Sequence, residues 1–205
     1  MISIGKLGAF VLLVSGIVLP EIVGYQTEGY SSQSNYLSEL GAIDARFSHF
    51  VNYFGFLPVG LAVITLVFVL SKKLPHVSLV RAGLICMLGV AVGYLGAVVF
   101  PCDNGCPSTG GVDQGFHNVA GLFEIIGATT GLFLLYFGCR TEVRGRFPLA
   151  TLAAAVVVTV GFLIMLIPEF GQVRGLTQRL ADYTIFVWFS YAVLKVSAPV
   201  IPKCK

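Results

Sequence analysis

Charged residues are scarce in this chain. Asp, Glu, Lys and Arg make up only 11% of its 205 residues, against about 25% in an ordinary soluble domain. The net charge is only +3, so the sequence lacks the basic surface that nucleic-acid binding requires. Hydrophobic residues instead make up 56% of the chain, and the mean hydropathy is +0.88. These values predict an integral membrane protein whose partners are membrane lipids and not nucleic acid.

No polar stretch is long enough to form a soluble domain, and the chain divides into apolar runs of membrane-spanning length. A helix needs roughly 20 residues to cross a hydrocarbon core of about 30 Å. Continuous apolar runs rich in Gly and Ala favour helices over the alternating pattern of a β-barrel. We therefore predict an all-α fold, a six-transmembrane-helix bundle, with residues 1–205 forming a single transmembrane domain. The predicted spans are residues 7–25, 47–70, 79–100, 116–138, 147–167 and 178–196.

The first apolar run has no A-x-A-like cleavage site after it. A cleavable signal peptide is the alternative interpretation, because Lys6 precedes the apolar stretch. However, the run continues through Pro20 and Glu21 to Tyr25. We therefore expect this segment to be retained as a membrane span.

Basic residues are unevenly distributed between the loops. Short loops rich in Lys and Arg stay in the cytoplasm, and placing both termini there puts ten of the 13 basic residues on the cytoplasmic side. Those ten are Lys6, Lys72, Lys73, Arg81, Arg140, Arg144, Arg146, Lys195, Lys203 and Lys205. This orientation predicts a multi-pass cell-membrane protein whose polar segments, residues 26–46, 101–115 and 168–177, lie outside.

The outer segment "FPCDNGCP" contains Cys102 and Cys106 four residues apart. An oxidising exterior and a tight loop around Asp103 together predict a disulfide between them. Two free thiols are the alternative. A redox-active pair is less favoured, because the spacing is not C-x-x-C and no second outer pair is present to relay electrons. Pro101 should end the preceding helix and leave Asp103 at its carboxyl end, where a metal, a histidine or an arginine would compensate the acid.

Histidine and acid residues begin the fourth apolar run. His117 and Glu124 are seven residues apart, which places them about 20° apart on one helix face and about 10 Å apart in depth. An ionisable residue within a membrane is costly, so Glu124 should be paired or protonated inside the bundle. His49 and Asn52 share a face by their i, i+3 spacing. The simplest alternative for each of these residues is a structural hydrogen bond or an interfacial position.

Two further patterns have ordinary structural interpretations. Arg179 and Asp182 stand at i, i+3 and are predicted to pair with each other. The stretch "SNYLSELGA" is expected to begin a short interfacial helix capped by Ser34 or Asn35.

The ordered motifs "SELGA", "NYFGFLPVGL", "FPCDNGCP", "FHNVAG" and "GLTQRLADYTIFVW" run from about Ser38 to Trp188. In this order and spacing the chain resembles the membrane family called domain of unknown function 998. The resemblance implies a six-span protein of bacterial or archaeal type and singles out Ser38 with Glu39, Asp103, and His117 with Asn118. It implies no settled activity.

Two functions are consistent with these residues. The first is a non-enzymatic membrane protein whose outward-facing polar cluster binds a lipid or small amphiphile. The alternative is a membrane-embedded, metal-dependent hydrolase of lipids, distantly similar to alkaline ceramidases, although the paired histidines of their final helix are missing here. Its catalytic candidates are Asp103, His117, Ser38 and Glu39, and its zinc ligands would be Asp103, His117, His49 and Glu124. Transport is disfavoured because no charged residue lines the inner half of the spans.

Overall fold

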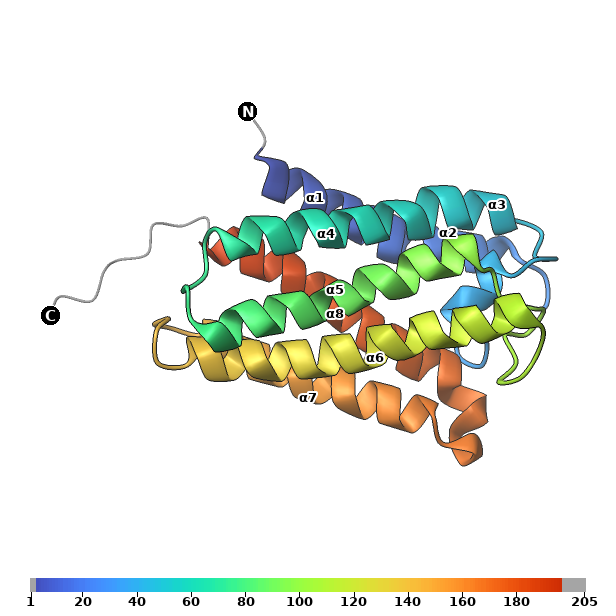
Figure 1. The fold of residues 1–205 in the computed structure, drawn as a ribbon. Helices are drawn as coiled ribbons and strands as arrows, with labels where there is room; N and C mark the ends of the chain where they lie inside the picture. Colours follow the sequence, from blue (N-terminus) through green and yellow to red (C-terminus); the bar gives the residue numbers. More distant parts are fainter. Residues whose placement is uncertain (1–2, 197–205) are drawn as a thin grey trace, which may run out of the picture.

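The computed structural model describes residues 3–196, and these residues form helices and connecting loops with no β-strand. Lys203, Cys204 and Lys205 lie outside the described residues. The long helices run alternately in opposite directions and pack side by side into one bundle (Figure 1). The α-helices are α1 (Ile4–Leu13), α2 (Leu19–Gln26), α3 (Ser48–Phe50), α4 (Leu57–Ser71), α5 (Ser78–Val99), α6 (Val112–Cys139), α7 (Phe147–Met165) and α8 (Arg174–Val196).

Short segments of other helix types connect or interrupt these elements. The π-helices η1 (Val14–Val18) and η3 (Val51–Phe56) make α1–α2 and α3–α4 continuous rods. Each π-segment ends two residues before a proline, Pro20 or Pro58. Proline removes one backbone donor and crowds the preceding turn, and a wider π-turn relieves that crowding within an unbroken helix.

Five helices are long and apolar enough to cross a membrane by length and composition: Ile4–Gln26, Ser48–Ser71, Ser78–Val99, Val112–Cys139 and Phe147–Met165. These helices indicate a membrane-embedded protein, and their bounds match the first five predicted spans within four residues at each end. Helix α8 occupies the position of the sixth predicted span and is 23 residues long, but it is not among the five.

Helix α8 packs against α1, α4 and α7, and passes behind α5 and α6 in Figure 1. Its polar residues Thr177, Arg179, Asp182 and Ser190 are buried. Their inclusion lowers the hydropathy of the helix, although these side chains contact protein. A hydropathy criterion treats every side chain as if it faced lipid, which explains why α8 differs from the other long helices.

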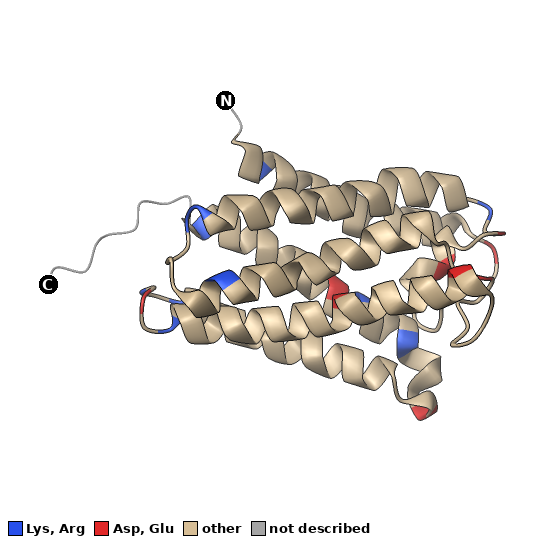
Figure 2. Ribbon diagram, viewed as in Figure 1, with Lys and Arg blue, Asp and Glu red and all other residues tan. Residues whose placement is uncertain are grey.

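Basic and acidic residues separate along the long axis of the bundle. Lysine and arginine gather at the end that contains the α4–α5 and α6–α7 loops, and most acidic residues lie toward the opposite end (Figure 2). The acidic end carries the longer connections, including the 3-10 helices η2 (Leu37–Gly41) and η4 (Pro168–Val173). The candidate residues of the sequence lie in this half of the molecule or at its end.

Helices α5 and α6 approach each other closely through glycine. A Cβ atom on Gly83 would lie 2.9 Å from the Gly131 backbone oxygen, and one on Gly131 would lie 2.9 Å from that of Gly83. Further toward the acidic end, Gly93 leaves room for the Glu124 side chain, whose carboxylate Oε2 lies 2.6 Å from the position of a Gly93 Cβ. The missing side chains therefore allow an acidic residue of α6 to pack directly on α5.

Candidate functional site

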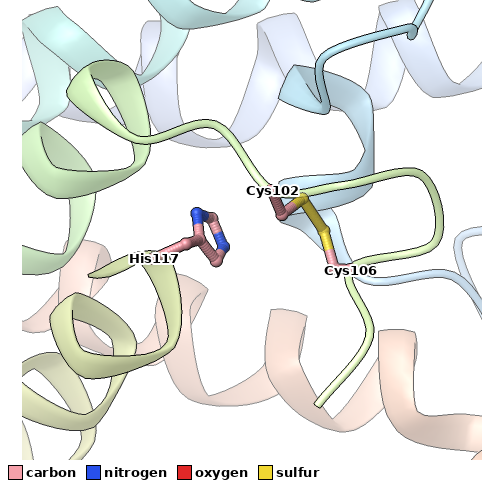
Figure 3. Close-up of side chains that lie close together, drawn as sticks. All are labelled: Cys102, Cys106 and His117. Carbon is pink, nitrogen blue, oxygen red and sulfur yellow. A yellow bond between two sulfur atoms is a disulfide. The ribbon is translucent and has the colours of Figure 1, made fainter. Parts of the chain in front are cut away.

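The loop between α5 and α6 is closed by the predicted disulfide. Cys102 and Cys106 are bonded through their sulfur atoms, with their Cα atoms 5.1 Å apart (Figure 3). The Cys106 N–H donates to the Asp103 carbonyl at 2.9 Å. Gly105 and Cys106 have φ angles of 77° and 44°, so the chain turns through two left-handed residues. Glycine adopts this conformation without steric cost. Gly105 therefore allows the tight turn that brings two cysteines four residues apart within bonding distance.

Gln114 attaches this loop to α6. It is fully buried, its Oε1 accepts from the Asp103 N–H at 2.7 Å, and its Nε2 donates to Asn118 Oδ1 at 2.8 Å. Asn118 in turn donates to the Ser108 carbonyl at 3.0 Å. The sequence interpretation missed Gln114, although its i, i+4 spacing with Asn118 at the start of an apolar helix was a signal.

Asp103 does not take the position expected for it. Its Oδ2 lies 2.4 Å from the position that a Cβ of Gly110 would occupy, and Asp103 is not part of the group of potential ligand atoms around His117. The loop therefore holds the Asp103 backbone through Gln114 and places its carboxylate against Gly110.

His117 lies between the end of α5 and the disulfide. Its Nδ1 lies 3.0 Å from the Phe100 carbonyl oxygen, and its other ring nitrogen points toward Cys102 and Cys106 (Figure 3). One ligand atom from each of these three residues lies within 4.8 Å of the other two. They are the only such group of His, Cys, Asp and Glu found within residues 3–196. The predicted metal set of Asp103, His117, His49 and Glu124 is therefore not brought together there.

His49 is separated from that group by the geometry of its own helix. It is exposed and stacks on Tyr53 with a centroid distance of 6.3 Å. Asn52 is buried and donates to the Gly41 carbonyl at 2.9 Å, and Ser48 donates to the same oxygen at 3.0 Å. The i, i+3 prediction assumed an α-helix, whereas η3 is a wider π-helix that places Ser48 and Asn52 on one face.

A cavity of about 70 Å³ brings together three of the predicted site residues: Ser38, His117 and Glu124. Tyr94 of α5 and Gln178 of α8 also line it. Asp103, Glu39 and His49 are not among its lining residues. A volume of this size accommodates a few water molecules or one small polar group. The cavity therefore offers a hydroxyl, an imidazole, a carboxyl and an amide to a small ligand.

The Glu124 carboxyl is shared with α8. Glu124 lies against Asp182, and each carboxyl group acts on the other electrostatically; Asp182 Oδ2 accepts from the Tyr94 hydroxyl at 3.3 Å. Within the described chain, no N–H or O–H group donates to the buried oxygens Glu124 Oε1 and Asp182 Oδ1. Two carboxylates in this position would repel each other, and a proton on one of them turns the repulsion into a hydrogen bond. We therefore interpret Glu124 and Asp182 as a pair that shares a proton.

Arg179 has a different partner from the one that the sequence predicted. Its Nε donates to Glu21 Oε1 at 2.8 Å in a salt bridge, while Asp182 bonds to Tyr94 and lies against Glu124. The i, i+3 interpretation was therefore wrong for Arg179 and Asp182, because Glu21 on a distant segment provides the closer acid. The remaining Arg179 donors bind the Tyr30 hydroxyl and the carbonyl oxygens of Ser32, Asn35 and Gly175.

This guanidinium fixes the polar segment between the first two long helices onto α8. Ser32 also donates to Glu21 at 3.3 Å, and the hydroxyl of Tyr183 donates to Glu21. Burial raises the pKa of Tyr30 to about 12, so its hydroxyl stays protonated while it accepts from Arg179. The cluster is densely hydrogen-bonded, and no sequence pattern indicated that Tyr30 belongs to it.

Glu39, a predicted catalytic residue, is fully occupied in a structural role. Its carboxylate accepts from the Tyr36 N–H at 2.8 Å and from Asn35 Nδ2 at 2.7 Å. It also forms a salt bridge of 3.3 Å with Arg174. These contacts cap η2, so the predicted short helix is present but begins at Leu37, with Tyr36 as its N-cap. Ser38, which directly precedes Glu39, lines the cavity instead.

An apolar groove adjoins the cavity on the side of α6 and α7. The groove has a volume of about 340 Å³; Leu122, Ile125, Met165 and Leu166 line its apolar part, and Tyr36, Ser108 and Asn118 are among its polar lining residues. Ser38, His117, Gly121 and Gln178 line both the groove and the cavity. Leu122 and Leu166 are exposed on the helix surface. In a membrane these side chains would contact lipid, so the groove leads from the lipid-facing surface to the polar cavity.

Comparison with known families is consistent with the sequence resemblance. A family described as "Protein of unknown function (DUF998)" matches residues 7–195. The chain belongs to this family. Because the match includes all of the long helices except their outermost residues, the DUF998 assignment applies to the whole bundle. No curated protein and no solved structure matches the chain.

Proposed function

We propose that this DUF998 protein crosses a bacterial cell membrane six times, with both termini in the cytoplasm. The 23 residues of α8 extend about 35 Å, which is sufficient to span a bilayer. Its buried polar side chains contact Glu21, Tyr94 and Glu124 and so avoid lipid. The concentration of Lys and Arg at one end of the bundle supports the cytoplasmic assignment of that end (Figure 2).

Labelling of single cysteines tests this topology. In a cysteine-free background, a membrane-impermeant maleimide should label Glu28→Cys in intact cells and Arg144→Cys only after permeabilisation. The reverse pattern would place the basic end outside, and equal labelling of both positions before permeabilisation would contradict a continuous membrane barrier between them.

We propose further that the protein binds a membrane amphiphile. Its polar group would occupy the cavity formed by Ser38, His117, Glu124 and Gln178, and its hydrocarbon chain would lie in the groove between α6 and α7. The observation that supports this proposal most directly is that the cavity and the groove share four lining residues. A continuous passage from polar to apolar lining matches the chemistry of an amphiphile and not that of a purely polar solute.

Gly121 provides a direct test because it lies where the cavity meets the groove. A Cβ added at Gly121 would meet no atom within 4 Å, so Gly121→Leu should fill the passage without disturbing the helix packing. Gly115 lies on the same helix, is equally open and lines neither space. Gly115→Leu is therefore the matched control.

The measurement is crosslinking of a diazirine-acyl phosphatidylethanolamine to the protein in nanodiscs, with peptides mapped by mass spectrometry. We expect labelling around Leu122, Ile125, Met165 and Leu166 in the unchanged protein and in Gly115→Leu. In Gly121→Leu this labelling should fall about tenfold, the effect of losing a contact worth about 1.4 kcal/mol. Equal labelling in all three proteins would contradict a bound amphiphile at this position.

Hydrolysis of the bound amphiphile is the second candidate function. It is favoured by the presence of a hydroxyl, an imidazole and a carboxyl on one small cavity, at Ser38, His117 and Glu124. These groups are the types that perform general acid–base and nucleophilic chemistry. Release of fatty acid or head group from phospholipid vesicles, lost in His117→Ala and retained in His49→Ala, would support it. No release above the level of vesicles without the protein would exclude hydrolysis of those lipids.

A further inference from the structure

We propose that Cys102, Cys106 and His117 form a zinc-binding site when the Cys102–Cys106 disulfide is reduced. This site differs from the oxygen-rich set that the sequence predicted, because it contains two sulfur ligands and neither Asp103 nor Glu124. Thiolate and imidazole ligands favour zinc over the hard cations that carboxylates bind. The proposal concerns the end of the cavity next to the α5–α6 loop and does not depend on amphiphile binding.

The spacing of the ligand atoms fits zinc after a small adjustment. The three atoms lie within 4.8 Å of one another. In a tetrahedral site, Zn–S distances of about 2.3 Å and Zn–N distances of about 2.0–2.1 Å place neighbouring ligand atoms roughly 3.5–3.8 Å apart. Reduction breaks the S–S bond and lets the two sulfur atoms move apart toward that distance. The turn through Gly105, which connects the two cysteines, can adjust to this change. The sulfurs and the imidazole can therefore converge while α5 and α6 keep their positions.

His117 is already oriented as a metal ligand. With a proton on Nδ1, the ring donates to the Phe100 carbonyl oxygen 3.0 Å away, and Nε2 keeps its lone pair. That nitrogen is the one directed at the two sulfur atoms (Figure 3). Histidines that bind metals typically donate their other N–H to a backbone carbonyl or a carboxylate, which fixes the tautomer and the direction of the ring.

Ser38 lies next to both sulfur atoms, beside the position where a fourth zinc ligand would bind. Its hydroxyl oxygen lies 3.3 Å from Cys106 Sγ, and its carbonyl oxygen lies 3.6 Å from Cys102 Sγ. Ser38 and His117 also line the polar cavity, so the open position of the metal would face it. Three protein ligands with one open position are typical of zinc sites that bind water or a substrate, and four protein ligands are typical of structural sites.

The disulfide controls this site chemically. In the oxidised protein each sulfur is bonded to the other and carries no thiolate charge, so only His117 remains as a ligand. A dithiol reductant transfers two electrons to the Cys102–Cys106 bond and becomes a cyclic disulfide, and its two protons pass to the cysteine sulfurs. Zinc binding then displaces the two thiol protons. The metal therefore binds only to the reduced protein.

Cobalt(II) binding to the purified full-length protein tests the proposal, because sulfur-to-cobalt charge-transfer absorption reports thiolate ligands directly. The other cysteines are first removed by Cys86→Ser, Cys139→Ser and Cys204→Ser. Reduction uses a phosphine, which takes oxygen from water to form a phosphine oxide and is removed before titration. We expect one cobalt ion per reduced chain, displaceable by zinc, and no charge-transfer band in the oxidised protein.

Ligand variants decide which residues bind. We expect His117→Ala to weaken cobalt binding at least about tenfold, and Cys102→Ser or Cys106→Ser to remove most of the charge-transfer intensity. His49→Ala and Glu124→Gln, which alter the set predicted from sequence, should leave affinity unchanged. His117→Cys should restore binding with a stronger charge-transfer band, which distinguishes a ligand from a residue needed only for folding. Unchanged affinity in His117→Ala, or equal binding by the oxidised protein, would overturn the proposal.

Discussion

Two acidic clusters connect helices of the bundle, one around the partly exposed Glu21 and one around the buried pair Glu124 and Asp182, and they are compensated in different ways. Glu21 forms a salt bridge with Arg179 and accepts hydrogen bonds from Ser32 and Tyr183. Glu124 and Asp182 lie against each other, and no salt bridge reaches either of them within residues 3–196. Arg179 acts on Asp182 only through its longer-range electric field. The first cluster is a charge-neutral connection between segments, whereas the second depends on a shared proton.

This difference separates structural acids from candidate functional acids. A buried charge that is fully paired has no capacity left for a ligand. Arg179 is in that condition, with its donors distributed over one carboxylate, one hydroxyl and three carbonyl oxygens. Glu124 lines the cavity and has neither a cation nor an N–H group bound to its buried Oε1. A ligand with a hydrogen-bond donor therefore finds an acceptor without a cation at Glu124, whereas Glu21 is already paired with Arg179.

The largest expected effect comes from removing the cation of the first cluster. Arg179→Met should lower the free energy of unfolding by about 3–5 kcal/mol, because it leaves Glu21 and several carbonyl oxygens without their donor. Denaturation of the purified protein in detergent measures the change. Arg174→Met is the matched control: its salt bridge to Glu39 is more exposed, with 34% of the arginine side chain accessible against 5% for Arg179. It should cost at most about 1 kcal/mol. Equal losses would contradict the central role of Arg179.

A smaller loss of stability is expected when a larger residue on α5 pushes against Glu124 of the second cluster. Gly93→Ala places a methyl group 2.7 Å from the Glu124 Cβ and 2.6 Å from its Oε2, and crowding of this kind costs about 1–3 kcal/mol. Gly121→Ala enters open space and should leave the unfolding midpoint unchanged or raise it slightly. If both variants unfold alike, the contact between α5 and Glu124 is not the tight one described above.

The smallest loss of stability is expected when an amide replaces one acid of the Glu124–Asp182 pair. Asp182→Asn supplies the donor that a protonated carboxyl would supply, so the free energy of unfolding should change by less than about 1 kcal/mol. Glu21→Gln, by contrast, removes the charge that Arg179 requires and should destabilise the protein by several kcal/mol. A large loss in Asp182→Asn would show that both Glu124 and Asp182 are charged and are held by a cation.

Much of the fold could be predicted from composition and hydropathy. Five predicted spans are present with nearly the expected bounds, because lipid imposes one simple requirement on each apolar run. The disulfide was also predictable from a short spacing within one loop. For Ser38, His117 and Glu124, the sequence predicted only that all three lie toward the same end of the molecule. It did not predict that they line one cavity. Their contact depends on how three separate segments pack.

Predictions from helical spacing failed where a competing partner was far away in sequence or where the helix was not α-helical. Arg179 and Asp182 stand at i, i+3, but Glu21 and Glu124 provide their partners from other helices. His49 and Asn52 also stand at i, i+3, but the π-helix η3 rotates them to different faces. Local spacing describes which residues are able to meet and contains no information about the neighbouring helices.

The sequence alone determined that this protein is an α-helical membrane protein with a polar end, because hydrophobic length and charge placement act on each segment independently. Only the tertiary structure decided which acids are paired and which line the cavity, and it placed His117 beside Cys102 and Cys106. Those outcomes depend on distances between side chains from different helices. Such distances arise when the helices pack, and no single segment encodes them.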